Sequence, residues 1–168
     1  CLAFPDNAFD IVLCTEVLEH IPPPSLFMAS QEIIRVTKYY AVIGVPYKQD
    51  IRLNRTICLS CKKRNPAWGH VNSFDENKLR HLFEPLRLEK MSFIGSKREK
   101  TNMVSVYLWD LAGNPWGTYV QQEPCVNCGN KLIAPSGRSV IQRLCSKLAD
   151  YIHMAQSCFI PITPVWVH

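Results

Sequence analysis

The stretch Phe9-Asp10-Ile11-Val12-Leu13-Cys14-Thr15-Glu16-Val17-Leu18-Glu19-His20 decides the fold. It begins with an apolar run, Phe9 to Cys14, directly after a Pro-Asp-Asn turn. Such a run is typical of a strand that is buried on both faces in a parallel sheet. Residues 15–21 then predict a short helical turn, because the prolines at 22–24 prevent its continuation.

Outward from this stretch, the pattern alternates between helices and strands. Ser25 is a good N-cap, and helical spacing of apolar residues predicts a helix from there to about Thr37. Tyr39 to Val45 is interpreted as a second buried strand. Next, a helix is expected over 73–83, capped by Ser73 or Asp75, followed by a strand over 86–94. Residues 102–111 are expected to form a helix, with a strand as the alternative. A further helix is expected over 139–154, and a final strand begins near Pro164. This order predicts an α/β fold with a partial doubly wound sheet.

Composition narrows the class of protein. The chain has 168 residues, the size of one domain, and 47% of them are hydrophobic, which excludes disorder. Its apolar segments are too short to cross a membrane. The first residues contain neither an initiator Met nor a signal-peptide pattern, so the chain is interpreted as part of a longer protein. The net charge of +5 is spread along the chain and permits nucleic-acid binding without indicating it.

Two motifs together resemble a known enzyme family. Leu2-Ala3-Phe4-Pro5-Asp6-Asn7-Ala8-Phe9-Asp10 and Val17-Leu18-Glu19-His20 are similar to the middle motif of class I (Rossmann-like) S-adenosylmethionine (SAM)-dependent methyltransferases, type 11. The resemblance covers roughly residues 1–95. It implies that the four expected strands are strands four to seven of that fold, with the last one antiparallel between strands five and six.

The same resemblance implies a limited part of a SAM site. The glycine-rich loop after strand one and the acidic residue after strand two of the family are absent from this chain. What remains is the rim: Leu2 near the adenine, with Cys14, Thr15 and Glu16 at the end of strand four. We therefore expect this chain alone to bind SAM weakly or not at all and to be inactive.

A carboxylate and histidine cluster is the candidate catalytic site. Glu16, Glu19 and His20 are spaced i, i+3 and i+4, so one helical face would present them together. His70 is expected to complete the set. The cluster could hold a second divalent cation that lowers the pKa of an acceptor hydroxyl, and it resembles the Glu-x-x-Glu-His of metal-dependent sugar-hydroxyl and quinone-biosynthesis methyltransferases. The alternatives are that His20 deprotonates or orients the acceptor, with the carboxylates as its partners, or that the cluster is structural.

Two cysteine pairs form the candidate zinc site. Four of the eight cysteines stand in Cys58-x-x-Cys61 and Cys125-x-x-Cys128, the spacing of zinc knuckles. This favours metal binding in a cytoplasmic protein over disulfides in a secreted one. The resembled sheet would place the two loops, 56–72 and 113–135, on one rim of a single incomplete domain over 1–168. A redox dithiol and unrelated free thiols are the alternatives.

The sequence thus predicts the carboxyl-terminal half of a SAM-dependent methyltransferase with a four-cysteine zinc site. Its partners would be SAM and an unknown methyl acceptor, with the methyl group going to a hydroxyl of a small molecule, a sugar or a nucleic acid. The alternative is a non-catalytic, zinc-stabilised binding module derived from this fold.

Overall fold

The computed structural model describes residues 2–96, 100–159 and 161–167, and the chain divides into two compact units. The first unit comprises Cys1–Gln49, Val71–Lys97 and Thr163–His168. The second unit comprises Asp50–His70 and Arg98–Ile162. That the whole chain is one incomplete domain stays a prediction.

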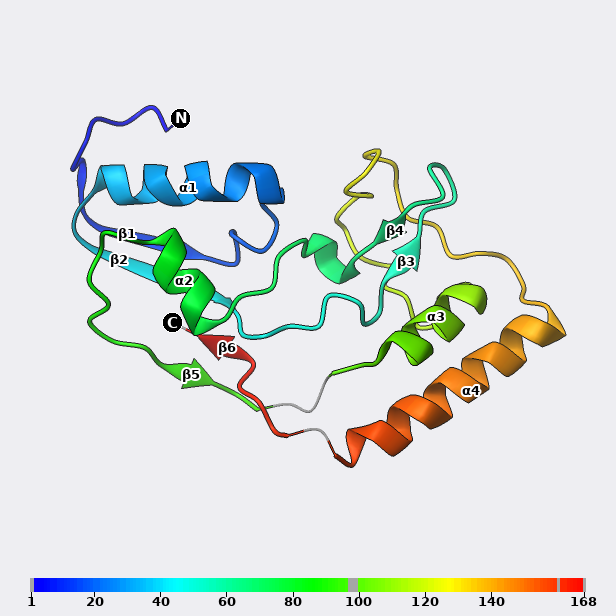
Figure 1. Cartoon of the computed structure of the whole chain (residues 1–168). Coiled ribbons are helices and arrows are strands. Elements are labelled where there is room, and N and C mark those ends of the chain that lie inside the picture. The colour runs from blue at the N-terminus through cyan, green and yellow to red at the C-terminus, as the bar shows by residue number, and fades with distance from the viewer. Residues whose placement is uncertain (1, 97–99, 160, 168) are drawn as a thin grey trace. The chain divides into compact units, whose positions relative to one another are not determined.

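The first unit is a mixed sheet with helices. Its elements are β1 (Phe9–Thr15), α1 (Pro23–Val36), β2 (Thr37–Pro46), α2 (Glu76–Leu82), β5 (Phe93–Ile94) and β6 (Trp166–Val167). The strand order is β1-β2-β6-β5, with β1 parallel to β2 and β6 antiparallel to both of its neighbours (Figure 1). The expected place of the last strand, antiparallel between the second and third, is confirmed.

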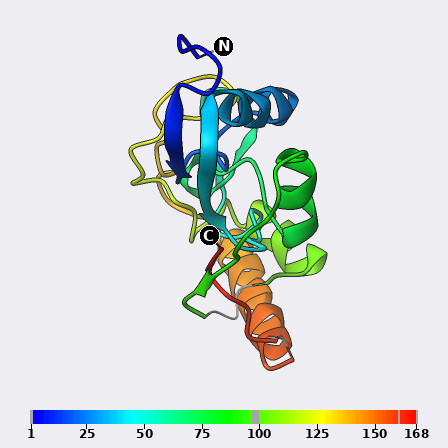
Figure 2. The same ribbon diagram turned by 90° about the vertical axis from the view of Figure 1, so that its left-hand side faces the viewer.

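One face of the β1–β2 pair carries the core. The two strands lie side by side in parallel register, with Leu13 opposite Val42, and α1 connects them and packs against them (Figures 1 and 2). Because α1 and the following segments bury their apolar residues against this face, a continuous cluster forms. Its most buried members are Leu18, Leu26, Val45, Phe74 and Val167.

The opposite face of the same strands is apolar and open. Ile11 and Leu13 of β1 are 62% and 68% exposed, and their partners in β2, Tyr40 and Val42, are exposed as well. The prediction that this strand is buried on both faces is therefore wrong for this chain. Among the described residues of the first unit, α1 covers only one side of the pair, so every second side chain of β1 points to solvent.

Helix α1 begins earlier than predicted. Its cap is Pro22, and the side chain of Ser25 makes no capping hydrogen bond. Pro23 and Pro24 occupy the first two helical positions, where a backbone N–H is not needed and the fixed φ of proline suits the helix. Ser25 therefore lies inside the helix, and its N–H donates to the carbonyl oxygen of Pro22 at 2.8 Å.

Two further predictions for the first unit are wrong in part. The helical turn predicted over 15–21 forms only over residues 17–21, where the N–H groups of His20 and Ile21 donate to the carbonyl oxygens of Val17 and Leu18. Thr15 belongs to β1, and Glu16 has a left-handed φ of 58°. Of the strand expected over 86–94, only β5 forms, since its two residues find a partner in β6. Helix α2 is capped by Asp75, whose side chain accepts a hydrogen bond from the N–H of Lys78 at 2.8 Å. Of the two predicted caps, Ser73 and Asp75, the second is therefore confirmed.

The second unit consists of a short hairpin and a helix pair. The hairpin is β3 (Thr56–Ile57) with β4 (Arg64–Asn65), followed by a 3-10 turn over Ala67–Gly69. Helices α3 (Met103–Leu111) and α4 (Val140–Ser157) pack against each other, which settles the 102–111 alternative in favour of a helix. The predicted helix over 139–154 is confirmed as α4. Among the helices of the described ranges, none combines the length and apolar character that crossing a bilayer requires.

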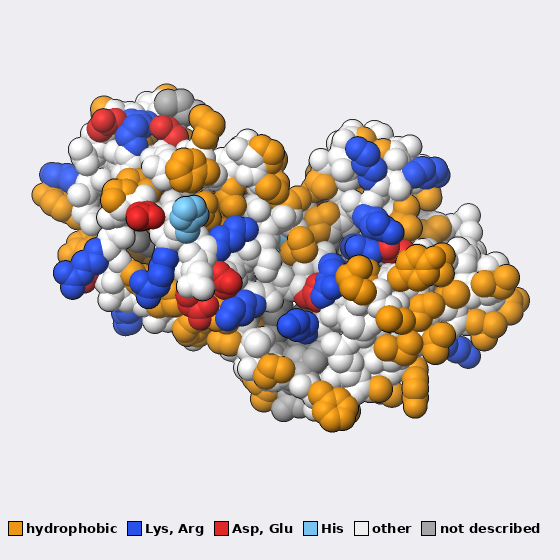
Figure 3. Space-filling view, viewed as in Figure 1, with side chains coloured by type: hydrophobic (Ala, Val, Ile, Leu, Met, Phe, Trp, Pro, Cys, Tyr) orange, Lys and Arg blue, Asp and Glu red, His pale blue; other side chains and the backbone are white. Residues whose placement is uncertain are grey.

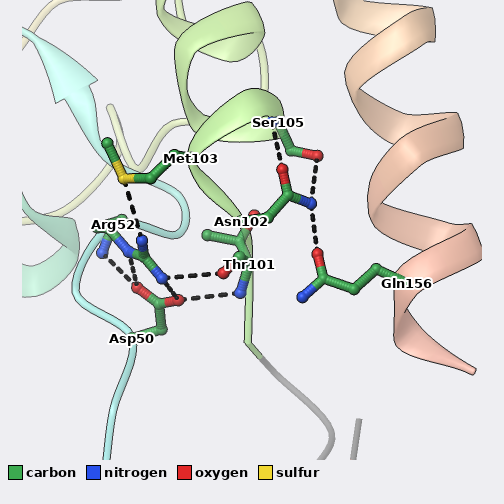
Figure 4. A network of polar contacts seen from close by, with 7 residues as sticks. All are labelled: Asp50, Arg52, Thr101, Asn102, Met103, Ser105 and Gln156. Atoms are coloured by element: carbon green, nitrogen blue, oxygen red, sulfur yellow. Dashed lines mark hydrogen bonds and ion pairs between the residues drawn. The ribbon is translucent and has the colours of Figure 1, made fainter. Parts of the chain in front are cut away.

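A polar network ties the two segments of the second unit together (Figure 4). The carboxylate of Asp50 accepts two hydrogen bonds from the guanidinium of Arg52, both at 2.7 Å, and one each from the backbone N–H groups of Arg52 and Thr101, at 3.2 and 2.9 Å. Asn102 caps α3 by accepting from the N–H of Ser105, and its amide donates to Gln156 of α4. The network therefore fixes where α3 begins.

Candidate functional site

The four paired cysteines meet in the second unit. Their sulfur atoms all lie within 4.8 Å of one another. The Sγ atoms of Cys58 and Cys128 are 3.7 Å apart, as are those of Cys61 and Cys125. These distances are far longer than the S–S bond of about 2.05 Å, and all four residues are free thiols. The prediction that the two pairs come together is confirmed, and the group is geometrically able to hold a metal.

The first pair lies in a tight hairpin between β3 and β4. The N–H of Lys62 donates to the carbonyl oxygen of Cys58 at 2.9 Å, and the N–H of Cys58 donates to that of Lys63 at 3.0 Å. Lys62 has a left-handed φ of 59°. This turn places Cys58, which is fully buried, and the half-buried Cys61 on the same side of the hairpin.

The second pair repeats the same hydrogen bonds. The N–H of Gly129 donates to the carbonyl oxygen of Cys125 at 2.8 Å, and the N–H of Cys125 donates to that of Asn130 at 2.9 Å. Gly129 has a φ of 71° and stands where Lys62 stands in the first hairpin. The site is thus built from two hairpins of equivalent backbone structure.

Asn65 joins the two hairpins. Its side chain is fully buried, and its Oδ1 accepts from the N–H of Val126 in the second hairpin at 2.8 Å. In the other direction, the side-chain amide of Asn127 donates to the carbonyl oxygen of Arg64 at 3.1 Å. Sequence reasoning missed Asn65, because a single asparagine after the first pair carries no signal of a contact 61 residues away in the chain.

The backbone around the first pair favours a thiolate. The N–H of Cys61 lowers the pKa of the Cys58 thiol to about 6, and the N–H of Ser60 and the Cys128 sulfur act in the same direction. At Cys61, the N–H of Lys63 acts to lower the pKa. Burial and the three neighbouring sulfurs outweigh it, and the pKa rises to about 11. Four crowded sulfurs of this kind share negative charge best when a cation lies between them.

The carboxylate and histidine residues follow β1 in the first unit. The N–H of Glu16 donates to the carbonyl oxygen of Gly44 in β2 at 3.2 Å, which anchors the turn to the carboxyl end of the strand pair. The carbonyl oxygen of Glu19 accepts from the N–H groups of Val71 and Asn72, at 2.7 and 3.2 Å.

Asn72 fixes this turn further. Its side-chain amide donates to the carbonyl oxygens of Leu18 and Ile21, at 2.9 and 2.6 Å. Asn72 is only 4% exposed, and like Asn65 it could not be recognised in the sequence, since its role depends on a tertiary contact. The turn over 17–21 is therefore held in one conformation.

Glu19 has an unusual environment. Its side chain is fully buried, and neither carboxyl oxygen has a hydrogen-bond partner among the described residues. Burial raises the pKa of the Glu19 carboxyl above its ordinary value of 4.5, and the charge of Glu16 adds to the rise. Burial, together with Glu19, also raises the pKa of the Cys14 thiol. His20, next in the chain, is exposed.

The remaining predicted site residues lie in different places. Cys14, Thr15 and Glu16 follow one another at the carboxyl end of β1. Leu2 is held at the other end, where its N–H donates to Glu32 at 2.6 Å and its carbonyl oxygen accepts from Arg35 at 3.1 Å, near the last turn of α1. A seven-residue strand spans about 20 Å, so Leu2 and Cys14 do not share one local surface. His70 belongs to the second unit, and its membership of the cluster stays a prediction.

The first residues of the chain match one family of known proteins. Residues 1–43, which contain β1, the turn after it, α1 and most of β2, match the family model described as "Methyltransferase domain". No curated protein and no solved structure matches the chain. The match supports the assignment of these residues to a class I, SAM-dependent methyltransferase domain.

Proposed function

We propose that the chain is the carboxyl-terminal part of a SAM-dependent methyltransferase that methylates an acceptor hydroxyl, with His20, Glu16 and Glu19 acting on that acceptor. The observation that carries the proposal is the carboxyl of Glu19, buried and without a hydrogen-bond partner among the described residues, inside the segment that matches the methyltransferase family.

The position of Glu19 supports a role in chemistry. Open α/β sheets bind their ligands at the carboxyl ends of parallel strands, and the turn with Glu19 directly follows such an end. A buried polar group without a partner destabilises the folded state by about 1–3 kcal/mol. Groups of this kind are concentrated where function requires them, so an acceptor or a cation is the expected partner of Glu19.

The chemistry would divide between cofactor and chain. SAM, when bound, would supply the electrophilic methyl group, and its sulfur would keep the electron pair of the broken S–CH3 bond and leave as a neutral thioether. As the acceptor oxygen forms its bond to that methyl, its O–H bond breaks and the proton passes to a ring nitrogen of His20. Glu16 would orient the imidazole and stabilise its charged form, and the carboxyl of Glu19 would hold the acceptor. Thr15 and Glu16 are accessible at the end of β1 and would line SAM from one side, with Cys14 behind them.

A divalent cation is the alternative partner of this turn. Carboxylate oxygens and an imidazole nitrogen are ligands that Mg²⁺, Mn²⁺ and Fe²⁺ accept, and a cation would lower the pKa of a coordinated hydroxyl. These two mechanisms, proton transfer to His20 and activation by a cation, differ in whether activity requires a divalent cation. Activity that survives removal of divalent cations would leave proton transfer to His20 as the mechanism.

We also propose that the four cysteines bind one structural zinc ion. A tetrahedral site with Zn–S distances of about 2.3 Å separates its sulfurs by about 3.8 Å. The two 3.7 Å pairs agree with that separation. Four protein ligands leave no open position, so the zinc would stabilise the second unit and take no part in catalysis.

The apolar face of β1 and β2 supports the view that more of the sheet belongs to this domain. Rossmann-like sheets carry helices on both faces, and Ile11, Leu13 and Tyr40 would be buried by such a second layer. A non-catalytic binding module derived from this fold is the second candidate function, because the second unit carries a surplus of basic side chains and an exposed tryptophan, Trp116.

The test is methyl transfer from labelled SAM to hydroxyl-bearing acceptors by the natural protein that contains this chain. We expect His20→Ala to lower kcat by about a hundredfold or more, since general-base catalysis contributes on that order. His81→Ala in α2, an exposed histidine, is the matched control and should leave kcat unchanged. Equal rates for the two variants would overturn the role of His20. An absence of transfer to every acceptor would favour the binding module.

A further inference from the structure

The prediction that the net positive charge is spread along the chain is wrong, because this charge belongs to the second unit. Residues 50–70 and 98–162 contain 11 Lys and Arg against 5 Asp and Glu, whereas the rest of the chain contains 8 against 9. On the face drawn in Figure 3, basic side chains and exposed apolar side chains lie together on the second unit. A module that is positive and partly aromatic on its surface fits a polyanion that also carries flat, apolar groups.

Two arginines line a cavity without acidic partners. The cavity has a volume of about 320 Å³ and contains Arg138, Arg143, Tyr119 and Asn114 in its wall; we name it the two-arginine cavity. Within the described ranges, neither arginine pairs with a carboxylate, and Nη1 of Arg138 is buried with no hydrogen-bond partner. Paired guanidinium groups are the side chains that proteins use most often to bind phosphate.

The other described arginines of this unit differ from these two. Arg52 is paired with Asp50, and both Arg55 and Arg64 are paired with Asp110. Two carboxylates therefore offset part of the charge of these three arginines. Arg138 and Arg143, by contrast, line a cavity and have no carboxylate partner among the described residues. The first turn of α4, which begins beside Arg138, adds the positive end of its helix dipole.

Asn114 connects this cavity to an aromatic one. Asn114 is 5% exposed, has a left-handed φ of 51°, and its Oδ1 has no hydrogen-bond partner among the described residues. It also lines a second cavity of about 270 Å³ with Trp109, Trp116 and Asp150, which we name the tryptophan cavity. The two cavities therefore lie on either side of the same turn.

The tryptophan cavity offers a fixed aromatic surface. The indole N–H of Trp109 donates to Asp150 at 2.8 Å, and that of Trp116 donates to the same carboxylate at 3.2 Å. One carboxylate thus orients both rings. Trp116 is nevertheless 61% exposed, so a flat ring is held in place and open to solvent. A base stacks readily on such a ring, and stacking tolerates any base because all have a π-face.

We propose that the second unit binds single-stranded nucleic acid, with a backbone phosphate between Arg138 and Arg143 and a base stacked on Trp116. The phosphate contacts supply charge-dependent affinity, and the stacked base selects a single strand over a duplex, in which the bases are already stacked. This binding does not rest on methyl transfer, so either claim can fail without the other.

The arginines are tested by fluorescence anisotropy of a labelled oligouridylate of about 12 nucleotides with the 168-residue chain. We expect Arg138→Gln and Arg143→Gln each to weaken binding by about tenfold and to reduce the slope of log K against log salt by about 0.7. The matched control is Lys147→Gln, which removes the same charge from an exposed residue of α4 outside both cavities. If the control weakens binding as much as the arginine variants, attraction is nonspecific and the proposal fails.

The stacking surface is tested by a pair of substitutions at Trp116. Trp116→Leu should weaken binding by about tenfold, whereas Trp116→Phe, which keeps an aromatic face, should retain most of the affinity. Zinc content and the circular dichroism spectrum of each variant report whether the unit is folded. Equal affinity of the Leu variant and the wild type would overturn the proposal. Equal affinity for a duplex and for the single strand would also overturn it. If inorganic phosphate competes as well as the unlabelled oligonucleotide does, the cavity is a small-anion site only, and the proposal fails.

Discussion

Lys62 and Gly129 occupy equivalent positions in the two cysteine hairpins. Each directly follows the second cysteine of its pair, each has a left-handed φ (59° and 71°), and each donates its N–H to the carbonyl oxygen of the first cysteine of the pair. Only one of them is glycine, which adopts this conformation without steric strain. The two hairpins therefore have the same backbone conformation, but only the first one, with Lys62 in the left-handed region, carries backbone strain.

This difference predicts that Lys62→Gly stabilises the second unit. The left-handed conformation is unfavourable for a side-chain-bearing residue by about 1–2 kcal/mol, and part of the gain is offset by the flexibility of glycine in the unfolded chain. We expect a net gain of about 0.5–1 kcal/mol in the free energy of unfolding, measured by urea denaturation of the metal-loaded protein. Gly129→Ala should lose about 1 kcal/mol or more. Lys63→Gly is the control, and an equal gain there would contradict the explanation.

Asp50→Asn is expected to destabilise the second unit at neutral pH. Burial acts to raise the pKa of the Asp50 carboxyl, but Arg52 and the N–H groups of Thr101 and Arg52 outweigh it and lower this pKa below its ordinary 3.8. Because the pKa of this carboxyl is lower in the folded state than in the unfolded state, its contribution to stability is fully present above the pKa of the unfolded state. The contribution is lost as the pH falls through the pKa of the folded state. We expect a loss of about 1–2 kcal/mol at pH 7 that shrinks below about pH 3.8.

The control for this substitution is Asp10→Asn. Asp10 pairs with Lys38 at 3.6 Å, but both side chains are largely exposed. Exposed pairs contribute less than about 1 kcal/mol, so this variant should change the unfolding free energy little. A change as large as that of Asp50→Asn would argue against the network in Figure 4 as the source of stability.

Glu19→Gln is expected to remove a pH dependence of stability. Because the folded pKa of Glu19 is raised, the folded state holds its proton more tightly than the unfolded state does. Wild-type stability therefore falls as pH rises from 4.5 through the folded pKa, and the uncharged variant lacks this fall. Urea midpoints measured across this range check the prediction. Glu84→Gln, an exposed position, should behave as the wild type does, and a similar fall in the Glu19 variant would refute the account of its burial.

Sequence patterns were sufficient where local chemistry decides structure. The run 9–14 predicted β1, and the helix predicted over 139–154 forms as α4, where Ser139 makes a capping box with Gln142. The spacing of the cysteine pairs predicted their partnership, which the geometry confirms. In each case the residues that carry the signal are neighbours in the chain or chemically distinctive.

Where the sequence failed, tertiary context decided. The segment 86–94 has alternating character along its length, but only Phe93 and Ile94 find a strand to pair with in β6. The turn after β1 has helical spacing, but the backbone of Glu16 is left-handed where it is tied to Gly44. Asn65 and Asn72 hold the two candidate sites in shape through contacts that no local pattern predicts.

The claim on which the second unit depends is that two separate Cys-x-x-Cys hairpins share one zinc ion. X-ray absorption at the zinc edge, with metal content measured on protein purified without chelator, tests it directly. We predict one zinc per chain with four sulfur neighbours at about 2.3 Å, lost in Cys58→Ser and Cys128→Ser but kept in Cys145→Ser. Protein that is folded without zinc, or zinc bound by nitrogen and oxygen in place of these sulfurs, would contradict the account.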